Sequence, residues 1–128
     1  MVEFLPCRDP VQIKVLCRQT QVAHTPAVHA YTAVENEEQI GFGLFEIEPA
    51  RVSILHIPND DYLADVLTRS AMNYALLQGI ELVSFQRANN IPLLQALEFV
   101  KDDINEDAEI KSFFRGCRNC AKTDGKPC

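Results

Sequence analysis

Blocks of hydrophobic and polar positions along the chain predict alternating strands and helices. A short strand is expected over residues 2–5. Asp9 followed by Pro10 then marks the start of a helix, because aspartate caps a helix N-terminus and proline suits the first helical position. Polar residues 19–21 and Pro26 end that helix. Its apolar stripe, at spacings of three and four residues, consists of Ile13, Leu16 and Cys17.

The next two segments predict a β-hairpin. Residues 28–34 alternate in polarity, residues 39–48 are rich in Ile, Phe and Leu, and the acidic turn 35–38 separates them. We interpret this turn as a solvated hairpin tip. Gly41 and Gly43 weaken the second strand, so they predict a bulge or the close approach of a neighbour or ligand.

The clearest helical pattern covers residues 61–78, with Gly79 as its C-terminal stop. Its buried face is expected to comprise Leu63, Val66, Leu67, Ser70, Ala71, Tyr74 and Ala75. The flanking strands, 52–57 and 80–85, should pair in parallel because a helical crossover joins them. Pro92 begins a shorter helix through Leu97.

The last part of the chain carries weaker signals. Phe99 and Val100 are expected to lead into a short extended piece, and Ile110, Phe113 and Phe114 mark a short amphipathic helix that Gly116 stops. We assign residues 1–116 to one domain and residues 117–128 to a basic tail that contains cysteines.

Composition narrows the function classes. The chain has 128 residues, 47% of them hydrophobic, which suits one domain. Its net charge is −6, and residues 111–128 hold five cations against one anion. An acidic body argues against nucleic-acid and membrane partners. We found no signal-peptide pattern and no apolar run of about 20 residues, so a cytoplasmic location is expected.

Residues 1–101 follow the element order of the GNAT (acyl-CoA N-acyltransferase) superfamily. The segment IGFGLF, residues 40–45, resembles the third strand of that family, and ALEF, residues 96–99, stands where the family has a Leu-Gly-Phe ending. The resemblance implies an α/β, GNAT-like mixed sheet with an antiparallel first half, a central crossover helix, and truncated N- and C-terminal parts.

The resemblance also locates the family's donor site. There, a loop of the type Arg/Gln-x-x-Gly-x-Gly/Ala holds the CoA pyrophosphate on backbone N–H groups and a helix dipole. The matching loop here reads Asn59, Asp60, Asp61 and Tyr62, with neither glycine nor cation. Carboxylates at a helix N-terminus compete for the same N–H groups and repel phosphate, and Asp65 adds a further one. Acetyl-CoA is therefore not expected as a cofactor.

The residues for acyl-transfer chemistry are also incomplete. The family's general acid is a tyrosine on its fourth helix, and Leu94 stands near that position here. A general base usually comes from the fourth strand, where His56 is the ionisable candidate. The alternative is that His56 is an ordinary surface or core-edge residue.

The tail contains a C-x-x-C pair, Cys117 and Cys120, followed by Cys128. Three thiolates suit zinc or iron, with a fourth ligand to come from elsewhere in the chain. The candidates for that ligand are Cys7, Cys17, His24 and His29. Arg115 and Arg118 favour the thiolate form, which also suits disulfide exchange. A charged tail without a metal or redox role is the third alternative.

Three functional hypotheses follow. The leading one is a GNAT-like protein without ordinary acetyl-CoA binding, which acts as a binding or assembly module for an unknown protein or small molecule. The second is a divergent acyltransferase that uses His56 as base and the basic tail to hold the donor. The third is a small metal or thiol-redox protein that uses its C-terminal cysteines. Homodimerisation is left open.

Overall fold

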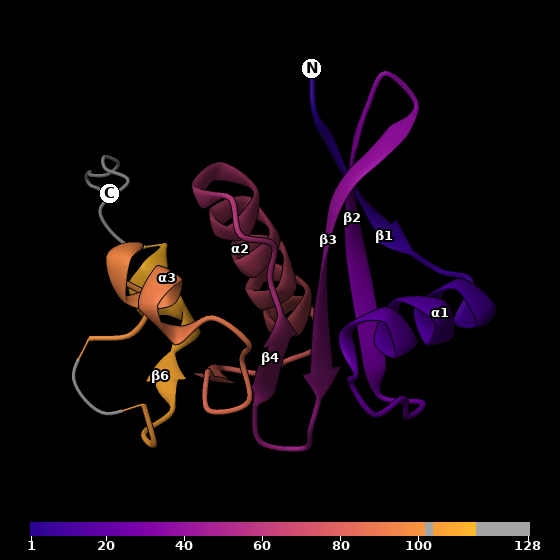
Figure 1. Cartoon of the computed structure of the whole chain (residues 1–128). Helices are drawn as coiled ribbons and strands as arrows, with labels where there is room; N and C mark the ends of the chain where they lie inside the picture. The colour runs from indigo at the N-terminus through magenta and orange to yellow at the C-terminus, as the bar shows by residue number, and fades with distance from the viewer. Residues whose placement is uncertain (102–103, 115–128) are drawn as a thin grey trace.

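The computed structural model describes residues 1–101 and 104–114, which form a six-stranded sheet with helices packed against it (Figure 1). In chain order, the elements are β1 (Glu3–Cys7), α1 (Pro10–Thr20), β2 (Val28–Glu35), β3 (Glu38–Ile47), β4 (Val52–His56), α2 (Asp61–Leu77), β5 (Leu82–Ser84), α3 (Ile91–Ala96), β6 (Ala108–Glu109) and the 3-10 helix η1 (Ile110–Phe113).

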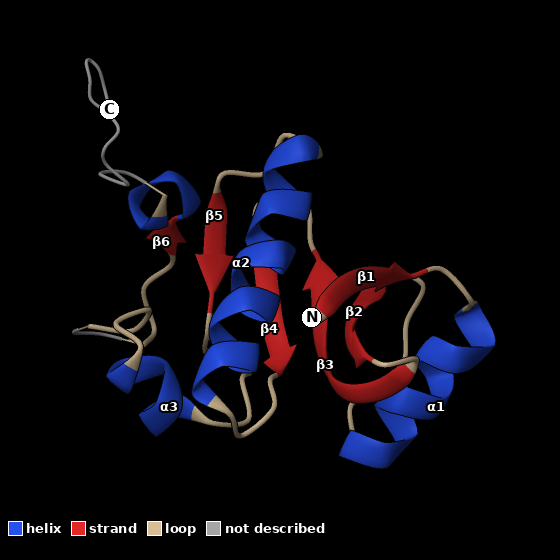
Figure 2. Ribbon diagram, turned by 90° about the horizontal axis from the view of Figure 1, so that it is seen from above, coloured by secondary structure: helices blue, strands red, loops and turns tan. Residues whose placement is uncertain are grey.

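The strands lie side by side in sequence order, β1-β2-β3-β4-β5-β6. Neighbours from β1 to β4 are antiparallel, and β4 and β5 are parallel, which confirms the predicted mixed sheet. β6 pairs antiparallel with β5 and was not predicted, because two residues carry no periodic pattern. Seen from above, α1 lies on the β1–β3 side and α3 on the β5–β6 side (Figure 2).

Helix α1 begins at the residues predicted from the sequence. Asp9 caps the helix, since its Oδ1 accepts a hydrogen bond from the N–H of Val11 at 3.0 Å, and Pro10 takes the first helical position. Gln21 ends the helix in the left-handed conformation, with φ 60°. The chain therefore turns back toward β2 directly after α1.

Helices α1 and α2 cover opposite faces of the sheet. Ala30 of β2 pairs with Leu44 of β3, and both pack with α1. The adjacent pair, His29 and Phe45, points to the other face because side chains alternate along a strand. Tyr74 of α2 packs on that pair, with ring centroids 5.1 Å from His29 and 5.7 Å from Phe45.

The buried face of α2 is rotated relative to the prediction. The buried residues are Leu63, Ala64, Leu67, Thr68, Ala71, Met72 and Ala75. Val66 and Ser70 are only partly buried, so their assignment to the core face was wrong, whereas Tyr74, also partly buried, does pack against the sheet. The physical reason is a second packing surface: Ala64 and Met72 belong to a core cluster with Leu94, Phe99 and other residues from α3 onward.

The two glycines of β3 allow α2 to lie close to the sheet. A Cβ at Gly43 would be 3.3 Å from Cβ of Leu67, and one at Gly41 would be 3.1 Å from Cδ1 of Leu63. This confirms the predicted close approach, and the neighbour is a helix of the same chain. The predicted bulge is also present, as a register shift beside Ala33 in the β2–β3 pair.

Arg69 of α2 ties the last described segment to the domain. Its Nη1 donates to the carbonyl oxygen of Phe113 at 2.6 Å, and its guanidinium lies 5.1 Å from the ring centroid of Phe99. Phe99 and Phe113 pack on each other at 5.4 Å. The extended piece expected at Phe99 and Val100 is not a strand, and Lys101 and residues 104–107, the described residues before β6, are in neither a strand nor a helix.

Candidate functional site

The end of β4 that leads into α2 is where the resemblance placed the donor site. β4 and β5 pair at Val52–Val83 and Ser53–Ser84 only, so the later part of β4 lacks β5 as a neighbour. The side chain of Asn89 takes that place beside Ile57. Its Oδ1 accepts from the Ile57 N–H at 2.9 Å, and its Nδ2 donates to the Ile57 carbonyl at 3.1 Å.

Side-chain hydrogen bonds hold the loop between β4 and α2 in place. Asp60 is the N-cap of α2, and its Oδ1 accepts from the N–H of Leu63 at 2.9 Å. Asn90 Nδ2 donates to Asn59 Oδ1 at 3.3 Å, which joins this loop to the segment before α3. Tyr62 is exposed and packs edge-on against Phe4 at 5.9 Å.

The other two carboxylates of this region lie differently. Asp61 begins α2 and is exposed. Asp65 lies one turn further on and forms a salt bridge with Arg69, with Oδ1 and Nε 3.2 Å apart. The N-terminus of α2 is therefore occupied by Asp60, while the charge of Asp65 is paired along the helix.

His56 ends β4 at a β-bulge. Leu44 pairs with His56 and Phe45 pairs with Ile54, so Leu55 is the extra residue. The ring of His56 stacks on Phe42 with centroids 4.9 Å apart. Burial lowers the pKa of His56, which keeps its imidazole neutral at pH 7. Leu94, near the family's general-acid position, is fully buried.

A second candidate site is a cavity of about 780 Å³ at the free edge of β2. β1 ends at Cys7, opposite Ala30, so Val28 and His29 of β2 extend beyond it. The cavity occupies this space. It lies between the first turn of α1, with Pro10 and Ile13, and the end of α2, with Leu77 and Gln78.

Aromatic side chains form one wall of this cavity. Phe45 lies 5.6 Å from His29 and 6.1 Å from Tyr31, ring centroid to ring centroid, in stacked arrangements. Tyr74 of α2 packs on His29 and Phe45 and completes this wall. Burial lowers the pKa of His29. Burial also raises the pKa of Tyr31, with Tyr74 adding to the effect and Arg8 opposing it.

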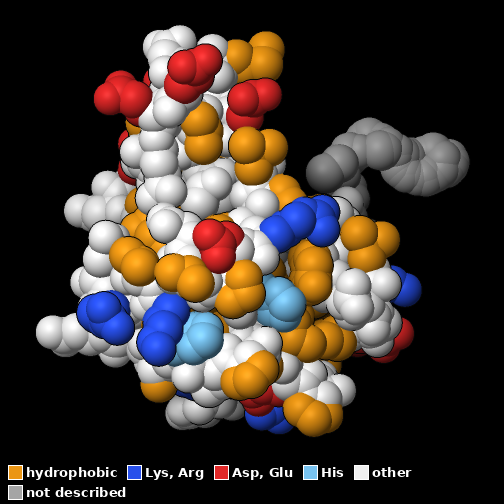
Figure 3. All heavy atoms as spheres, turned by 90° about the vertical axis from the view of Figure 1, so that its right-hand side faces the viewer, with side chains coloured by type: hydrophobic (Ala, Val, Ile, Leu, Met, Phe, Trp, Pro, Cys, Tyr) orange, Lys and Arg blue, Asp and Glu red, His pale blue; other side chains and the backbone are white. Residues whose placement is uncertain are grey.

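The lining of the cavity contains basic residues but no acidic ones. Arg8 and the exposed His24 lie on it, and none of its lining residues is acidic. Figure 3 faces the β1 and α1 side of the molecule and shows histidine side chains among hydrophobic ones, with Lys or Arg side chains nearby. Most acidic side chains in that view lie at its top, toward the hairpin tip, and another lies nearer the histidines.

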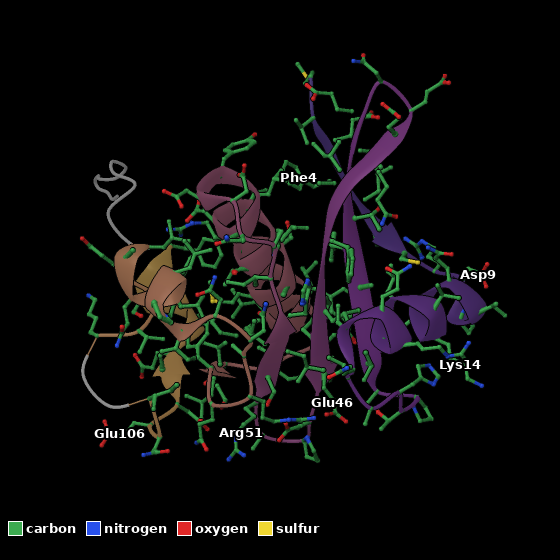
Figure 4. The ribbon with its side chains drawn as sticks, in the orientation of Figure 1. Phe4, Asp9, Lys14, Glu46, Arg51 and Glu106 are labelled. Atoms are coloured by element: carbon green, nitrogen blue, oxygen red, sulfur yellow. The ribbon has the colours of Figure 1, made fainter. Side chains whose placement is uncertain are left out.

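A polar network crosses the sheet on the α1 face. Arg87 Nη1 lies 2.6 Å from Glu46 Oε1 and 3.3 Å from Glu48 Oε2. Ser53 Oγ donates to Glu48 Oε2 at 2.5 Å. The hydrogen bond from Arg87 lowers the pKa of Glu46. Figure 4 labels Glu46 on β3 and Arg51 before β4, at the end of the sheet opposite the hairpin tip.

The C-terminal cysteines, Cys117, Cys120 and Cys128, lie outside the described residues. Cys7 and Cys17 are free thiols, and Cys17 packs in the core with α1. Within residues 1–101 and 104–114, no group of three or more His, Cys, Asp or Glu side chains is placed to hold a metal ion. None of the helices in this part of the chain is long and apolar enough to cross a membrane.

Comparison with known proteins defines the fold class. No family model matches the chain, and no curated protein matches its sequence. Its structure is similar to a tandem GNAT protein from the clavulanic acid biosynthesis pathway, solved without acetyl-CoA, with a TM-score of 0.51 and 10% sequence identity. The likeness covers 77% of this chain and 43% of that protein. The chain therefore has a GNAT-like fold and spans less than half the length of that protein.

Some site residues were not anticipated from the sequence. In the sequence, Asn89 is simply a polar residue shortly before a predicted helix. Its partner Ile57 is 32 positions away, so no local pattern predicts the contact. The residues of the cavity come from five helices and strands and from the loops on either side of α1, so no local pattern joins them. The one available signal was the alternation that places His29 and Tyr31 on the same face of a strand.

Proposed function

We propose that this GNAT-fold chain is a binding or assembly module without ordinary acetyl-CoA binding. The observation that carries the proposal is the pair of hydrogen bonds between Asn89 and Ile57. A ligand with amide groups, such as the pantetheine arm of CoA, can bind an open strand edge as an additional strand does. Here, the polar backbone groups of Ile57 already have partners in the same chain.

The loop before α2 supports the same conclusion. A helix N-terminus binds phosphate through free N–H groups and its positive dipole end. Asp60 already accepts from Leu63, and its carboxylate and that of Asp61 repel a pyrophosphate. At about 4 to 5 Å and an effective dielectric near 20, each such repulsion costs about 3 to 4 kcal/mol before salt screening. Two repulsions of this size remove micromolar affinity.

Isothermal calorimetry with acetyl-CoA at physiological salt tests the proposal. We expect a Kd no tighter than about 1 mM. The matched gain-of-function variant combines Asp60→Gly, Asp61→Arg and Asp65→Gly, and it should bind more tightly than the unchanged chain. A micromolar Kd for the unchanged chain would overturn the proposal.

One observation favours a second candidate, a divergent acyltransferase. His56 lies on the fourth strand, and burial keeps it in the neutral form that a general base requires. Transfer of an acetyl group from acetyl-CoA to amine acceptors, with His56→Ala as the comparison, tests this alternative. Turnover that is lost in His56→Ala would favour the acyltransferase over the binding module.

A further inference from the structure

The cavity at the free edge of β2 is separate from the region of the donor site. Val28, which lines it, pairs with Glu46, and Glu46 pairs with Ser53 near the start of β4. The Asn59–Tyr62 loop follows the other end of β4. Along α2, the loop meets the first turn, whereas Leu77 at the last turn lines the cavity. A ligand in the cavity would therefore not occupy the donor position.

The cavity suits a small ligand with an apolar body. Its volume of about 780 Å³ lies within the usual range for small-molecule sites, roughly 300 to 1,000 Å³. Both faces of the sheet contribute apolar walls, with Ile13 and Val28 from the α1 side and Phe45 from the α2 side. Leu77 lines the cavity while 76% exposed, which places it where the cavity meets solvent.

The charged and polar groups define what the ligand must offer. Arg8 forms no salt bridge with any residue in the described part of the chain, and the lining contains no carboxylate that could pair with it. The raised pKa of Tyr31 keeps its hydroxyl protonated at pH 7, and the lowered pKa of His29 keeps its imidazole uncharged. The cavity thus presents one permanent cation and no carboxylate, which favours an anionic group on the ligand over a cationic one.

We infer that this cavity binds a small aromatic carboxylate, with the carboxylate at Arg8 and the ring against the wall formed by Tyr31, His29 and Tyr74. Guanidinium and carboxylate groups match in geometry and form charge-assisted hydrogen bonds. Aromatic rings add offset and edge-to-face contacts to apolar burial. The inference deepens the proposed function, because it gives the binding module a ligand class.

The test uses one acid and its neutral analogue, 3-phenylpropionate and 3-phenylpropionamide, titrated into the full chain and followed by two-dimensional NMR. We expect the acid to bind at least about tenfold more tightly than the amide. Shifted resonances should map to the ends of β1 and α2. Equal binding of the two compounds, or no binding of either at 10 mM, would overturn the inference.

Substitutions at two exposed positions, Arg8 and Leu77, test the site, and each has a matched control. Arg8→Gln should weaken the acid by about tenfold and leave the amide unchanged, whereas Arg18→Gln, at an exposed position of α1 that does not line the cavity, should change neither. Leu77→Glu should abolish binding of the acid through repulsion, and Leu77→Gln should largely preserve it. Unchanged affinity in both Arg8→Gln and Leu77→Glu would contradict the assigned site.

The two proposals fail separately. Acetyl-CoA binding at the Asn59–Tyr62 loop would overturn the proposed function, yet it leaves the response of the acid to Arg8→Gln unaltered. Conversely, if 3-phenylpropionate does not bind at Arg8, the result of the acetyl-CoA titration is unaffected. Competition between acetyl-CoA and 3-phenylpropionate for one site would contradict the separation argued from the register of the strands.

Discussion

The side-chain amide of Asn89 forms two hydrogen bonds with the backbone of Ile57, as a neighbouring strand would, although 32 residues separate the two positions. The pair joins β4 to the segment between β5 and α3 where the two parallel strands no longer pair. It satisfies the backbone polar groups of Ile57, directly after β4, where β5 no longer pairs.

Asn89→Leu should test the energetic role of this pair, because leucine keeps the volume of the side chain and removes both hydrogen bonds. We expect a loss of about 1 kcal/mol in the free energy of unfolding, since the freed Ile57 groups regain only water. Urea denaturation measures the loss, and amide hydrogen exchange at Ile57 should accelerate. Asn59→Ala, which removes one longer contact in the adjacent loop, is the control and should cost less.

The glycines of β3 should respond unequally to alanine. Gly43→Ala brings a methyl group against Cβ of Leu67 and the carbonyl of His56, which cannot move without shifting backbone. We expect a cost of about 1 to 3 kcal/mol. Gly41→Ala comes closest to the end of the Leu63 side chain, which can rotate away, and its other contacts, with Pro58, are at ordinary van der Waals distance, so its cost should be smaller. Equal costs in urea denaturation would show that α2 does not press on β3 as described.

The Glu46–Arg87 pair should stabilise the fold only above acidic pH. Because the pKa of Glu46 is lowered from 4.5, its contribution is present above that value and is lost as the pH falls through the lower folded pKa. Glu46→Gln should therefore cost up to about 1 kcal/mol at pH 7 and nothing below the folded pKa. Glu38→Gln, at the exposed hairpin tip, is the control. A cost that persists in acid would contradict the ion-pair origin.

His56 should make stability fall on mild acidification. Its folded pKa is lowered from 6.5, so the unfolded chain binds the proton first and stability decreases as the pH drops below 6.5 toward the folded value. His56→Gln should reduce the dependence of unfolding free energy on pH between 7.5 and 5.5, leaving the part that comes from His29, whose pKa burial also lowers. His24→Gln, on the exposed loop after α1, is the control variant. Identical slopes for both variants would argue against a buried, neutral His56.

Local chemistry determined much of the fold by itself. Asp9 and Pro10 start α1, Asp60 caps α2 and Gly79 ends it with φ 85°, because capping and left-handed turns depend on residues close in sequence. The hairpin turn at Asn36 and Glu37, both with positive φ, follows from the same kind of signal. The order of these elements also led to the mixed sheet and its parallel β4–β5 pair.

Tertiary structure alone decided the rest, since it depends on contacts between distant residues. The rotation of α2 toward Met72 follows from packing against α3 and the segment after it, which no period within α2 can encode. β6 exists because β5 offers it an edge. The bridge from Asn89 to Ile57, and the cavity that brings Arg8 to Tyr31 and Leu77, arise only when the sheet and both of its helices are assembled.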